Sequence, residues 1–516
     1  MLPEDVIIGF EQEFAISFTP EDGTSLPELT YRTVLKQATE CLIDHRVLDY
    51  ENSMGGRIYI DHPLRVSQEL RRGFYHHLEA ATPECRGARE AALYSRAADA
   101  EILGRFLRVC QNPKRFSLPQ GSYHLLKAST DWRGNWWGLH RNFRIPQRIP
   151  NEFLLSYLGP FLVTKVVWAG QGGIAPRLYG PKNLDSWPNS DKEIIFTLSP
   201  RALAIQGTIS SETTVRRPLI CTGRFSDYKS YDLPQWKRLQ LIEGDPLLSD
   251  TITYVEAGMT SLVLRLLANN CFPRCFPRFE TYQYREILND FHILACDPTL
   301  KTPIHFASAI TLTALEVQRR YLELIWENAD KLSLTAEDQD VLYRFEEILR
   351  LLGQDPTLLA GVSECWFKYL LFEKKLAQYN TSWDACHEVR IEHHGKQISL
   401  SEYLLMLHHQ LTALDDWGIW PQLVRSGRVE TLFSDEEVAE ARKHPPATRA
   451  AWRVEVLRQA RRNRLLAPLG HSWSHIILMS FDPAAVNNDP TGRSNTQALR
   501  RAEELIKKIL KERLIV

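Results

Sequence analysis

The chain has 516 residues, of which 44% are hydrophobic and 24% are charged, and its formal net charge is −1 at pH 7. This length accommodates a large hydrophobic core and more than one domain, and the composition is that of an ordinary soluble globular protein. A net charge so close to zero gives no support for non-specific binding to nucleic acid or to an anionic membrane. We therefore expect neither kind of partner.

Targeting signals and membrane segments are not evident in the sequence. No segment approaches the ~20 apolar residues that span a bilayer. Acidic Glu4 and Asp5 replace the basic start of a signal peptide, so we expect a cytoplasmic protein. The nine cysteines are scattered, which argues against a secreted disulfide framework. Cys271 and Cys275 form a C-x₃-C pair without a second Cys/His pair at finger-like spacing, and we interpret them as loop or core thiols.

The first predicted strand carries two acidic residues on one face. Residues 6–16 are mostly β-branched or aromatic, and Glu11 and Glu13 lie two positions apart among them. Strand side chains alternate between faces, so the two carboxylates lie side by side and repel each other unless a cation or a shared proton lies between them. A solvated edge strand explains the pair without any ligand. A site for a hard cation such as Mg²⁺ also explains it, because carboxylate oxygens suit that ion.

A second cluster follows at residues 55–85. Residues 55–61 predict a strand with Arg57, Tyr59 and Asp61 on one face. Arginine is a natural clamp for a phosphate, and an aspartate next to it can act as a general base. Glu79 lies among apolar neighbours, which a purely exposed acid would not require.

Further polar residues come later in the chain. His140 follows a glycine-containing turn and shares a predicted strand face with Asn142, and the sequence leaves open whether it is structural or a ligand. Arg201 and the pair Arg216–Arg217 lie beyond it. Arginines near carboxylates usually form salt bridges, but close to a Mg²⁺ site they can hold a polyphosphate and the phosphoryl group in transfer.

The pattern of predicted elements changes along the chain. Up to about residue 300, short strand-like runs alternate with helices and with turns rich in Gly, Pro and Asn. From about residue 303 to 429, apolar residues recur at spacings of three and four, which predicts a mainly helical portion. After Pro445–Pro446, strand signals return and residues 498–515 predict a final amphipathic helix. We expect an α+β fold with a large domain over residues 1–429 and a small C-terminal domain over residues 430–516.

The order and content of these clusters resemble the Pup ligase and Pup deamidase/depupylase family, relatives of glutamine synthetase and of γ-glutamyl-cysteine ligase. The family's opening G-x-E-x-E-[FY] is similar to residues 9–14, its G-x-R-x-Y-x-D strand to residues 55–61, and its late S-W to residues 472–473. Further similar segments are residues 77–85, 127–143, 160–172, 237–260 and 445–450. Each motif alone is weak, but together they follow the family's order almost from end to end.

The resemblance implies a glutamine synthetase-like large domain, with a twisted, mainly antiparallel sheet that forms an open cradle backed by helices. ATP would lie at one end of this cradle, where the small C-terminal domain contributes, with Mg²⁺ held over the sheet. The implied site residues are the metal ligands Glu11, Tyr59 and Glu79, with Glu13 and His140 as less certain members; the ATP contacts Arg57, Thr82 and Trp473; Asp61 as catalytic base or nucleophile; and Arg201 and Arg217 along the phosphoryl path.

The chain also departs from the family pattern. About a dozen residues, 63–75, follow Asp61 where the family has a tight turn. An alternative register aligns residues 71–76 with the family's R-x-Y-x-D strand and leaves no catalytic aspartate, but we prefer the first register because its motif is intact. The family's H-E-N contains Arg141 here, and its R-L-H ends in Gln240. These changes are expected mostly in the half of the cradle that meets the tag and the amine, so either the substrate differs or the chemistry is retuned.

Three functions remain open at this point. An ATP- and Mg²⁺-dependent ligase would phosphorylate a carboxylate of a small protein tag or peptide for attack by the amine of a lysine. An isopeptidase or deamidase would use Asp61 to attack or to activate water, with ATP as cofactor. Residues 82–84 and the insertion favour the hydrolase branch, whereas Glu13–Phe14 favours the ligases. A pseudoenzyme would bind nucleotide without chemistry.

Overall fold

The structure is a computed structural model that describes residues 1–43, 53–61, 77–132, 135–176, 193–211, 213, 217–223, 235–307, 309–471, 473–478 and 484–513. The insertion at 63–75 and the alternative register at 71–76 lie outside the described residues, as do Arg216 and Ser472. The preference for the first register therefore stays a prediction.

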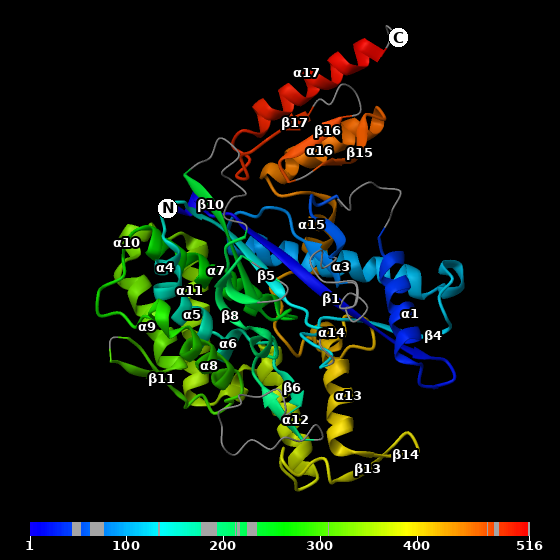
Figure 1. Ribbon diagram of the computed structural model, residues 1–516, viewed down its shortest axis with the longest axis vertical. Coiled ribbons are helices and arrows are strands. Elements are labelled where there is room, and N and C mark those ends of the chain that lie inside the picture. The colour runs from blue at the N-terminus through cyan, green and yellow to red at the C-terminus, as the bar shows by residue number, and fades with distance from the viewer. Residues whose placement is uncertain are drawn as a thin grey trace.

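A twisted sheet of eight strands forms the centre of the described chain (Figure 1). Its order is β2-β3-β1-β5-β10-β9-β8, and β4 pairs with β1 outside this path. The strands are β1 (Ile8–Pro20), β2 (Arg57–Asp61), β3 (His77–Ala81), β4 (Gly121–Leu126), β5 (Leu139–Pro146), β8 (Gly207–Ser210), β9 (Pro218–Cys221) and β10 (Trp236–Gly244). These pairs are antiparallel except for β8 with β9, which is parallel. The predicted α+β class and mainly antiparallel sheet are confirmed.

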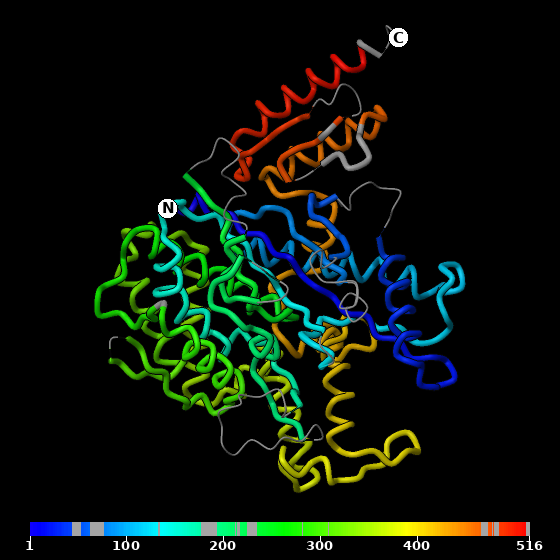
Figure 2. The backbone as a smooth tube through the Cα atoms, in the orientation of Figure 1, coloured from blue at the N-terminus to red at the C-terminus, as the bar shows by residue number. Residues whose placement is uncertain are grey.

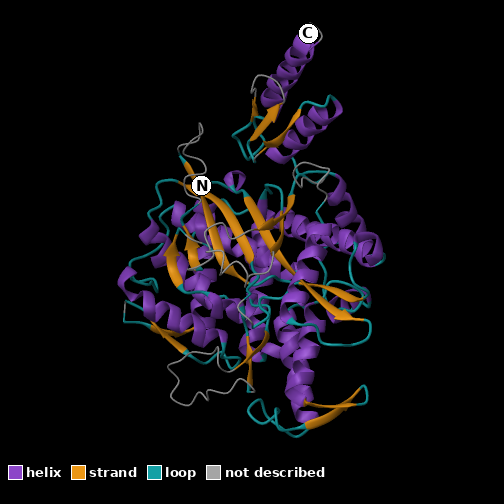
Figure 3. Cartoon of the chain, turned by 45° about the vertical axis from the view of Figure 1, so that its right-hand side comes forward, coloured by secondary structure: helices purple, strands orange, loops and turns teal. Residues whose placement is uncertain are grey.

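Helices cover one face of this sheet (Figure 3). In β1, Phe10, Gln12 and Phe14 alternate with the two glutamates and are buried beneath the sheet. α3 (Gly87–Cys110) and α7 (Asp250–Ala268) pack against each other there and contact β1 and β5, respectively. Every residue of α7 is buried, which explains why this helix lacks a polar face. The opposite sheet face is left for polar side chains.

The middle of the chain is mainly helical, as the three- and four-residue spacing predicts. Capping boxes such as Thr313–Glu316 and Ser399–Glu402 fix where several of these helices begin. The remaining helices up to residue 443 are α1 (Glu28–Cys41), α4 (Asn151–Phe153), α5 (Gly159–Thr164), α6 (Val166–Ala169), α8 (Tyr284–Ala295), α9 (Ala314–Glu327), α10 (Ala329–Leu332), α11 (Ala336–Gln354), α12 (Glu364–Gln378), α13 (Leu400–Thr412), α14 (Ile419–Arg425) and α15 (Asp435–Lys443). Small two-stranded sheets join β6 (Gly173–Pro176) to β7 (Ile194–Thr197), β11 (Pro303–His305) to β12 (Thr311–Thr313) and β13 (Arg390–His393) to β14 (Lys396–Ser399).

A second hydrophobic core lies in the C-terminal part, which Figure 2 shows at one end of the molecule. It is built from α16 (Arg449–Arg462), α17 (Asn495–Arg513) and a sheet of β15 (Leu466–His471), β16 (His475–Leu478) and β17 (Ala484–Val486). This core begins at Trp452, whereas α15 packs on α3 of the main body. The domain boundary at residue 430 stays a prediction.

Among the described helices, none combines the length and the apolar character that a membrane crossing requires.

Candidate active site

The open face of the sheet brings the predicted acids together in adjacent rows. The antiparallel register places Glu13 opposite Glu79, and Tyr59 lies opposite Glu79 on its other side. Glu11 lies opposite His140 in the neighbouring row. Directly opposed residues project to the same face of a sheet. These five predicted metal ligands, contributed by four strands, therefore form one polar group.

The two ends of β2 extend this group. Asp61 lies two residues beyond Tyr59 and opposite His77, so it shares the acidic face. Asp61 is solvent-exposed at the end of the strand, yet partial desolvation raises the pKa of its carboxyl, and the nearby charge of Glu13 raises it further. Arg57 lies at the opposite end of the same strand face. The structure thus sets the proposed base beside the acids and the proposed nucleotide contact at the far end.

Glu13 is a buried carboxylate with protein partners for both oxygens. Its Oε1 lies 3.3 Å from Nδ1 of His77, and its Oε2 accepts a hydrogen bond from the Gly138 N–H at 2.5 Å. Burial would raise the pKa of Glu13, but the hydrogen bond to His77 and the positive charges of His77, His140 and Arg201 outweigh it and lower the pKa to about 2. Glu13 is therefore ionised at neutral pH.

Glu11 is held by β10 and β5. Arg238 donates to its Oε1 at 2.5 Å, and Gln240 donates to its Oε2 at 2.9 Å. His140 Nδ1 lies 3.5 Å from the same Oε2. Asn142 Oδ1 accepts a further hydrogen bond from Arg238 at 3.0 Å, which fixes the orientation of the guanidinium. The negative charge of Glu11 is balanced by an arginine in this arrangement.

Glu79 has the least compensation among these acids. Its side chain is buried, and burial followed by the charges of Glu13, Glu11 and Asp61 raises its pKa well above the ordinary value. The Tyr59 hydroxyl hydrogen-bonds to it, and burial also raises the pKa of Tyr59. A proton or a bound cation relieves this repulsion. The negative potential at the centre of this face therefore favours binding of a proton or a cation next to Glu79.

The donor set suits Mg²⁺ chemically, but its side chains are not preassembled around an ion. Within the described residues, no group of three or more His, Cys, Asp or Glu side chains is arranged to hold a metal. Glu11 directs its oxygens to Arg238 and Gln240, and Glu13 directs its oxygens to His77 and Gly138. Carboxylates are hard-cation ligands, and these must exchange partners to bind one.

Arg201 and Arg217 place positive charge close to the acids. Arg201 is 2% exposed, and a Cβ added to Gly138 would lie 2.8 Å from its Cζ. The pKa of Arg201 is lowered, because the effect of burial outweighs the opposing effect of Glu13 and other acids. Burial and then the charge of Arg201 lower the pKa of Arg217 to about 10. Two neighbouring guanidiniums, one buried and one half-buried, favour an anionic ligand between or beside them.

The C-terminal part meets the sheet at Trp473. The guanidinium carbons of Arg57 and Arg453 lie 4.6 and 4.8 Å from the centroid of the Trp473 ring. Arg449 and Arg453 both pair with Glu84, which follows β3. Burial would raise the pKa of Glu84, but the two arginines lower it to about 2. Arg57 and Trp473, which are far apart in sequence, therefore share one corner of the cradle.

Thr82 lies deeper than the other predicted nucleotide contacts. Its side chain is 3% exposed, and its Oγ1 accepts a hydrogen bond from the Phe10 N–H at 2.9 Å. The same hydroxyl lies 3.1 Å from the Pro83 carbonyl oxygen, to which it donates. These bonds fix the chain as it leaves β3. Direct contact between Thr82 and ATP stays a prediction.

Several site residues escape the sequence-based prediction. His77 could have been found, because it precedes Glu79 by two residues on the same strand and must share its face. Gly138 and Arg238 join the site only through tertiary pairing with Glu13 and Glu11.

The departure at Arg141 does not alter the open face. Arg141 is buried on the helix side of the sheet, where it pairs with Glu243 and Glu256, and Lys165 joins the same two acids. The expectation that this acid-to-base change faces the tag and the amine is therefore wrong. Its physical reason is strand alternation, since Arg141 follows His140 directly.

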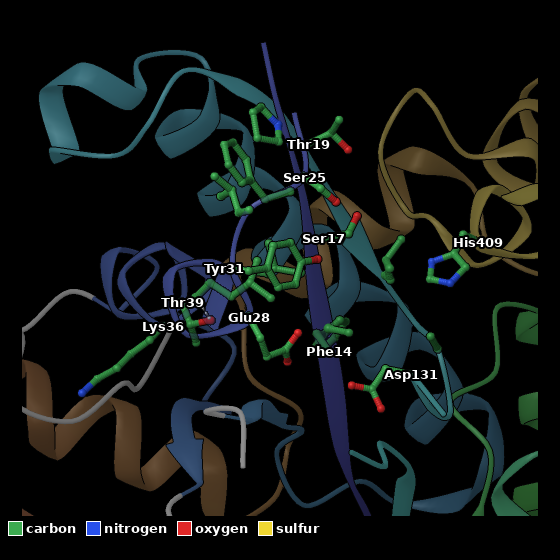
Figure 4. A pocket seen from close by; sticks show the side chains of 18 of the residues that line it. Phe14, Ser17, Thr19, Ser25, Glu28, Tyr31, Lys36, Thr39, Asp131 and His409 are labelled. Atoms are coloured by element: carbon green, nitrogen blue, oxygen red, sulfur yellow. Dashed lines mark hydrogen bonds between the residues drawn. The ribbon is translucent and has the colours of Figure 1, made fainter. Parts of the chain in front are cut away.

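A cavity of about 530 Å³ continues along β1 from the end of the acidic rows. Consecutive residues of β1 from Phe14 to Pro20 line it. Among them, Ala15, Ser17 and Thr19 follow Glu13 at two-residue intervals, so small side chains take the place of the glutamates on that face. Figure 4 shows Tyr31 of α1 on one side of the strand and His409 of α13 on the other. This cavity, called the trough below, begins on β1 at Phe14 and Ala15, directly after Glu13 in the sequence.

The twisted sheet with helices behind it and an open, acidic face in front is the arrangement expected of a glutamine synthetase-like carboxylate–amine ligase. The sequence model of the family described as Pup-ligase protein matches residues 6–477, and the chain belongs to this family. It is 27% identical to a Pup deamidase/depupylase of Mycolicibacterium smegmatis, with 91% of each chain covered. It is 28% identical to a Pup–protein ligase of Acidimicrobium ferrooxidans, with 88% of this chain and 89% of the relative covered.

Solved structures confirm the fold. The complex between the prokaryotic ubiquitin-like protein Pup and its ligase PafA matches with a TM-score of 0.76 and 18% identity, covering 98% of this chain and 95% of that chain. PafA in complex with ADP matches with a TM-score of 0.71 and 20% identity, covering 95% and 96%. The protein is therefore a member of a family of ATP-dependent carboxylate–amine ligases whose relatives include depupylases.

Proposed function

We propose that this protein is an ATP- and Mg²⁺-dependent ligase that activates a carboxylate of Pup or a similar small protein tag for attack by a lysine amine. The observation that carries the proposal is that Asp61, Glu11, Glu13 and Glu79 share one open sheet face, with the buried Arg201 next to it. Location in the cytoplasm stays a prediction from the sequence.

The proposed role of each residue in the cradle follows from its position. Glu11, Tyr59 and Glu79, with Glu13 and His140 as less certain members, would hold Mg²⁺, which neutralises charge on the phosphates when it is bound. Arg57 and Trp473 would bind the nucleotide where the C-terminal part meets the sheet. Arg201 and Arg217 would stabilise charge on the transferred phosphoryl group. Asp61 would accept the proton of the attacking amine.

The trough along β1 supports an extended peptide as the carboxylate donor. Its volume of about 530 Å³ lies within the range of ligand sites in proteins. Ala15, Ser17 and Thr19 are small enough to leave room for a main chain along β1, and they continue the strand face that carries Glu13. A tag that lies in it would present a carboxylate to the cradle.

A depupylase or deamidase is the second candidate, because a Pup deamidase/depupylase is among the relatives that match 91% of the chain. In that case Asp61 would attack the amide carbon or activate water at the same position. A nucleotide-binding pseudoenzyme is the third candidate, and the position of Asp61 beside the acids is the observation that argues against it.

Turnover with a defined tag separates these functions. The protein is incubated with ATP, Mg²⁺ and Pup in three forms: with a free carboxylate, as an amide, and joined to a lysine-containing protein. ADP formed in proportion to a new isopeptide bond supports the ligase. Release of tag or ammonia without stoichiometric ATP use supports the hydrolase instead. Saturable nucleotide binding without any product would overturn both enzymatic proposals.

Two substitutions test the roles of the acids. Asp61→Asn should abolish product formation and leave ATP affinity within about twofold, because the residue acts on the amine or water and not on the nucleotide. Glu11→Gln should raise the Mg²⁺ concentration for half-maximal activity about tenfold or more, since it removes one anionic ligand. Asp22→Asn, an acid with no part in the cradle, is the matched control and should change neither quantity.

A further inference from the structure

Asp245 is a buried carboxylate directly after β10, and it has no part in the proposed metal, nucleotide or catalytic sites. Its Oδ1 accepts hydrogen bonds from the Ser129 hydroxyl at 2.7 Å and from the Arg201 N–H at 3.0 Å. Its Oδ2 accepts one from the Gln171 N–H at 3.3 Å. The Asp245 side chain is 3% exposed, so water does not compete for these donors. One carboxylate thus joins three loops to the end of a central strand.

The surroundings of Asp245 hold it in this orientation. Gln171 is fully buried, and its Nε2 donates to the carbonyl oxygens of Lys127 and Pro246, each at 2.5 Å. The Lys368 ammonium donates to the Gln171 carbonyl oxygen at 3.0 Å. Each acceptor has a donor from another segment, so rotation of the Asp245 carboxylate would leave buried polar groups unpaired at about 1–3 kcal/mol each.

Arg201 depends on this hub for its position. It opens a short 3₁₀ turn (Arg201–Ala204), and Asp245 binds the first amide of that turn. From there the side chain passes Gly138, and its Nε donates to the Ile242 carbonyl oxygen at 3.2 Å. One terminal nitrogen, NH1, is buried and has no hydrogen-bond partner among the described residues. A buried donor left unpaired beside the acidic face, where the proposed function puts the transferred phosphoryl group, points to a ligand oxygen as its partner.

We propose that Asp245 is a positioning residue that directs the free NH1 group of Arg201 at the anionic group in transfer. This inference rests on the proposed function, in which Arg201 stabilises the phosphoryl group. Aspartate suits the task because its two oxygens accept from three donors. Asparagine would keep the size but set an NH₂ group against at least one N–H or O–H donor.

The test combines Asp245→Asn with Arg201→Lys in ligation or depupylation assays. Asp245→Asn should lower kcat about tenfold or more and leave the KM for ATP within about twofold, because misplacing a group that acts in the transition state costs rate and not binding. The double variant should be no slower than Arg201→Lys alone, within about twofold. Losses that multiply in the double variant would show that Asp245 acts independently of Arg201 and would overturn the proposal.

Asp250→Asn is the matched control. Asp250 is also a buried aspartate, but its Oδ2 accepts from the Thr431 hydroxyl at 2.7 Å and from the Leu432 N–H at 3.1 Å, away from Arg201. It should lower the thermal midpoint about as much as Asp245→Asn and leave kcat unchanged. An equal loss of kcat in both variants would assign Asp245 a merely structural role.

A milder variant covers the case in which Asp245→Asn does not fold. Ser129→Ala removes one donor to the same Oδ1 atom without changing buried charge. It should lower kcat several-fold, and the loss should vanish in the Arg201→Lys background. If Arg201→Lys itself leaves kcat unchanged while Asp61→Asn abolishes turnover, the Asp245 proposal fails and the proposed function stands. If Asp61→Asn stays active, the proposed function fails.

Discussion

Single residues on the open sheet face differ in how their charge is balanced, and this difference sorts their roles. Glu13 is ionised because His77, His140 and Arg201 surround it, whereas burial and neighbouring acids favour a neutral or cation-bound Glu79. The two acids face each other across one strand pair. A face that combines a fixed anion with an uncompensated one holds a cation more readily than two solvated carboxylates do.

Gly138 contacts both sides of this charge balance, since it lies against the Arg201 guanidinium and donates its N–H to Glu13. Gly138→Ala should lower turnover about tenfold or more, because the added Cβ would lie 2.8 Å from Cζ of Arg201 and must displace that guanidinium. Steady-state kinetics should show the loss in kcat. Gly361→Ala is the control, since a Cβ at Gly361 meets nothing within 4 Å. An unchanged kcat in Gly138→Ala would show that the position of Arg201 does not matter for turnover.

At the scale of elements, α16 is fastened to the turn after β3 by Glu84, which accepts from Arg449 at 2.5 Å and from Arg453 at 3.1 Å. These bonds join the C-terminal part to the main sheet. The pairing also aligns Arg453 with the Trp473 ring and with the Gly55 carbonyl oxygen, to which Arg453 donates at 2.6 Å. The contact of α16 therefore helps to shape the predicted nucleotide corner.

This contact should become less stable at acid pH. The pKa of Glu84 falls from 4.5 to about 2 on folding, so its stabilisation is complete above pH about 4.5 and is lost as the pH falls toward 2. The shift corresponds to roughly 3 kcal/mol. Hydrogen exchange of the α16 amides at pH 7 and pH 3 should show about 2 kcal/mol of this loss, because pH 3 still lies above the folded pKa. Glu84→Gln should remove most of the difference, whereas the exposed-pair control Glu455→Gln should cost less than about 1 kcal/mol. Parallel pH profiles in wild type and Glu84→Gln would contradict the assignment.

β1 carries both the acidic residues of the proposed metal site and residues that line the trough, so it connects that site with the proposed path of the tag. Ser17→Trp should raise the KM for Pup about tenfold or more and leave ATP affinity unchanged, since the indole fills the trough beyond the nucleotide corner. Ser122→Trp is the control. Ser122 lies on β4 opposite Thr19 of β1, but its side chain is exposed and does not line the cavity. Equal KM values for Ser17→Trp and wild type would exclude the trough as the path of the tag.

At the scale of the whole molecule, the nucleotide corner combines β2 with a C-terminal part that has its own hydrophobic core. A ligand bound there contacts both parts and should stabilise their association. Saturation at 100 times the Kd would add about 2.7 kcal/mol to the stability of the bound state. ATP should therefore raise the midpoint of thermal unfolding, and Trp473→Ala should largely abolish that rise. Trp326→Ala, on α9 of the helical portion, is the control and should keep it. A full ATP effect in Trp473→Ala would remove Trp473 from the nucleotide site.

The sequence by itself determined the fold class and the content of the acidic face. Two-residue alternation places Glu11 beside Glu13 and Arg57 beside Tyr59 and Asp61, because strand side chains alternate whatever lies next to them. The ordered motifs identified the family, which the match over residues 6–477 shows. Local patterns of this kind need no knowledge of distant partners.

Only the tertiary structure decided which groups meet. Strand order sets Glu79 between Tyr59 and Glu13, and a separate core brings Trp473 to Arg57. It also moved Arg141 to the helix side of the sheet. Pairing between distant strands depends on packing over the whole sheet, so no local pattern reveals it. The sequence therefore named most of the candidate site, while its charge balance and the Asp245 hub came from long-range contacts.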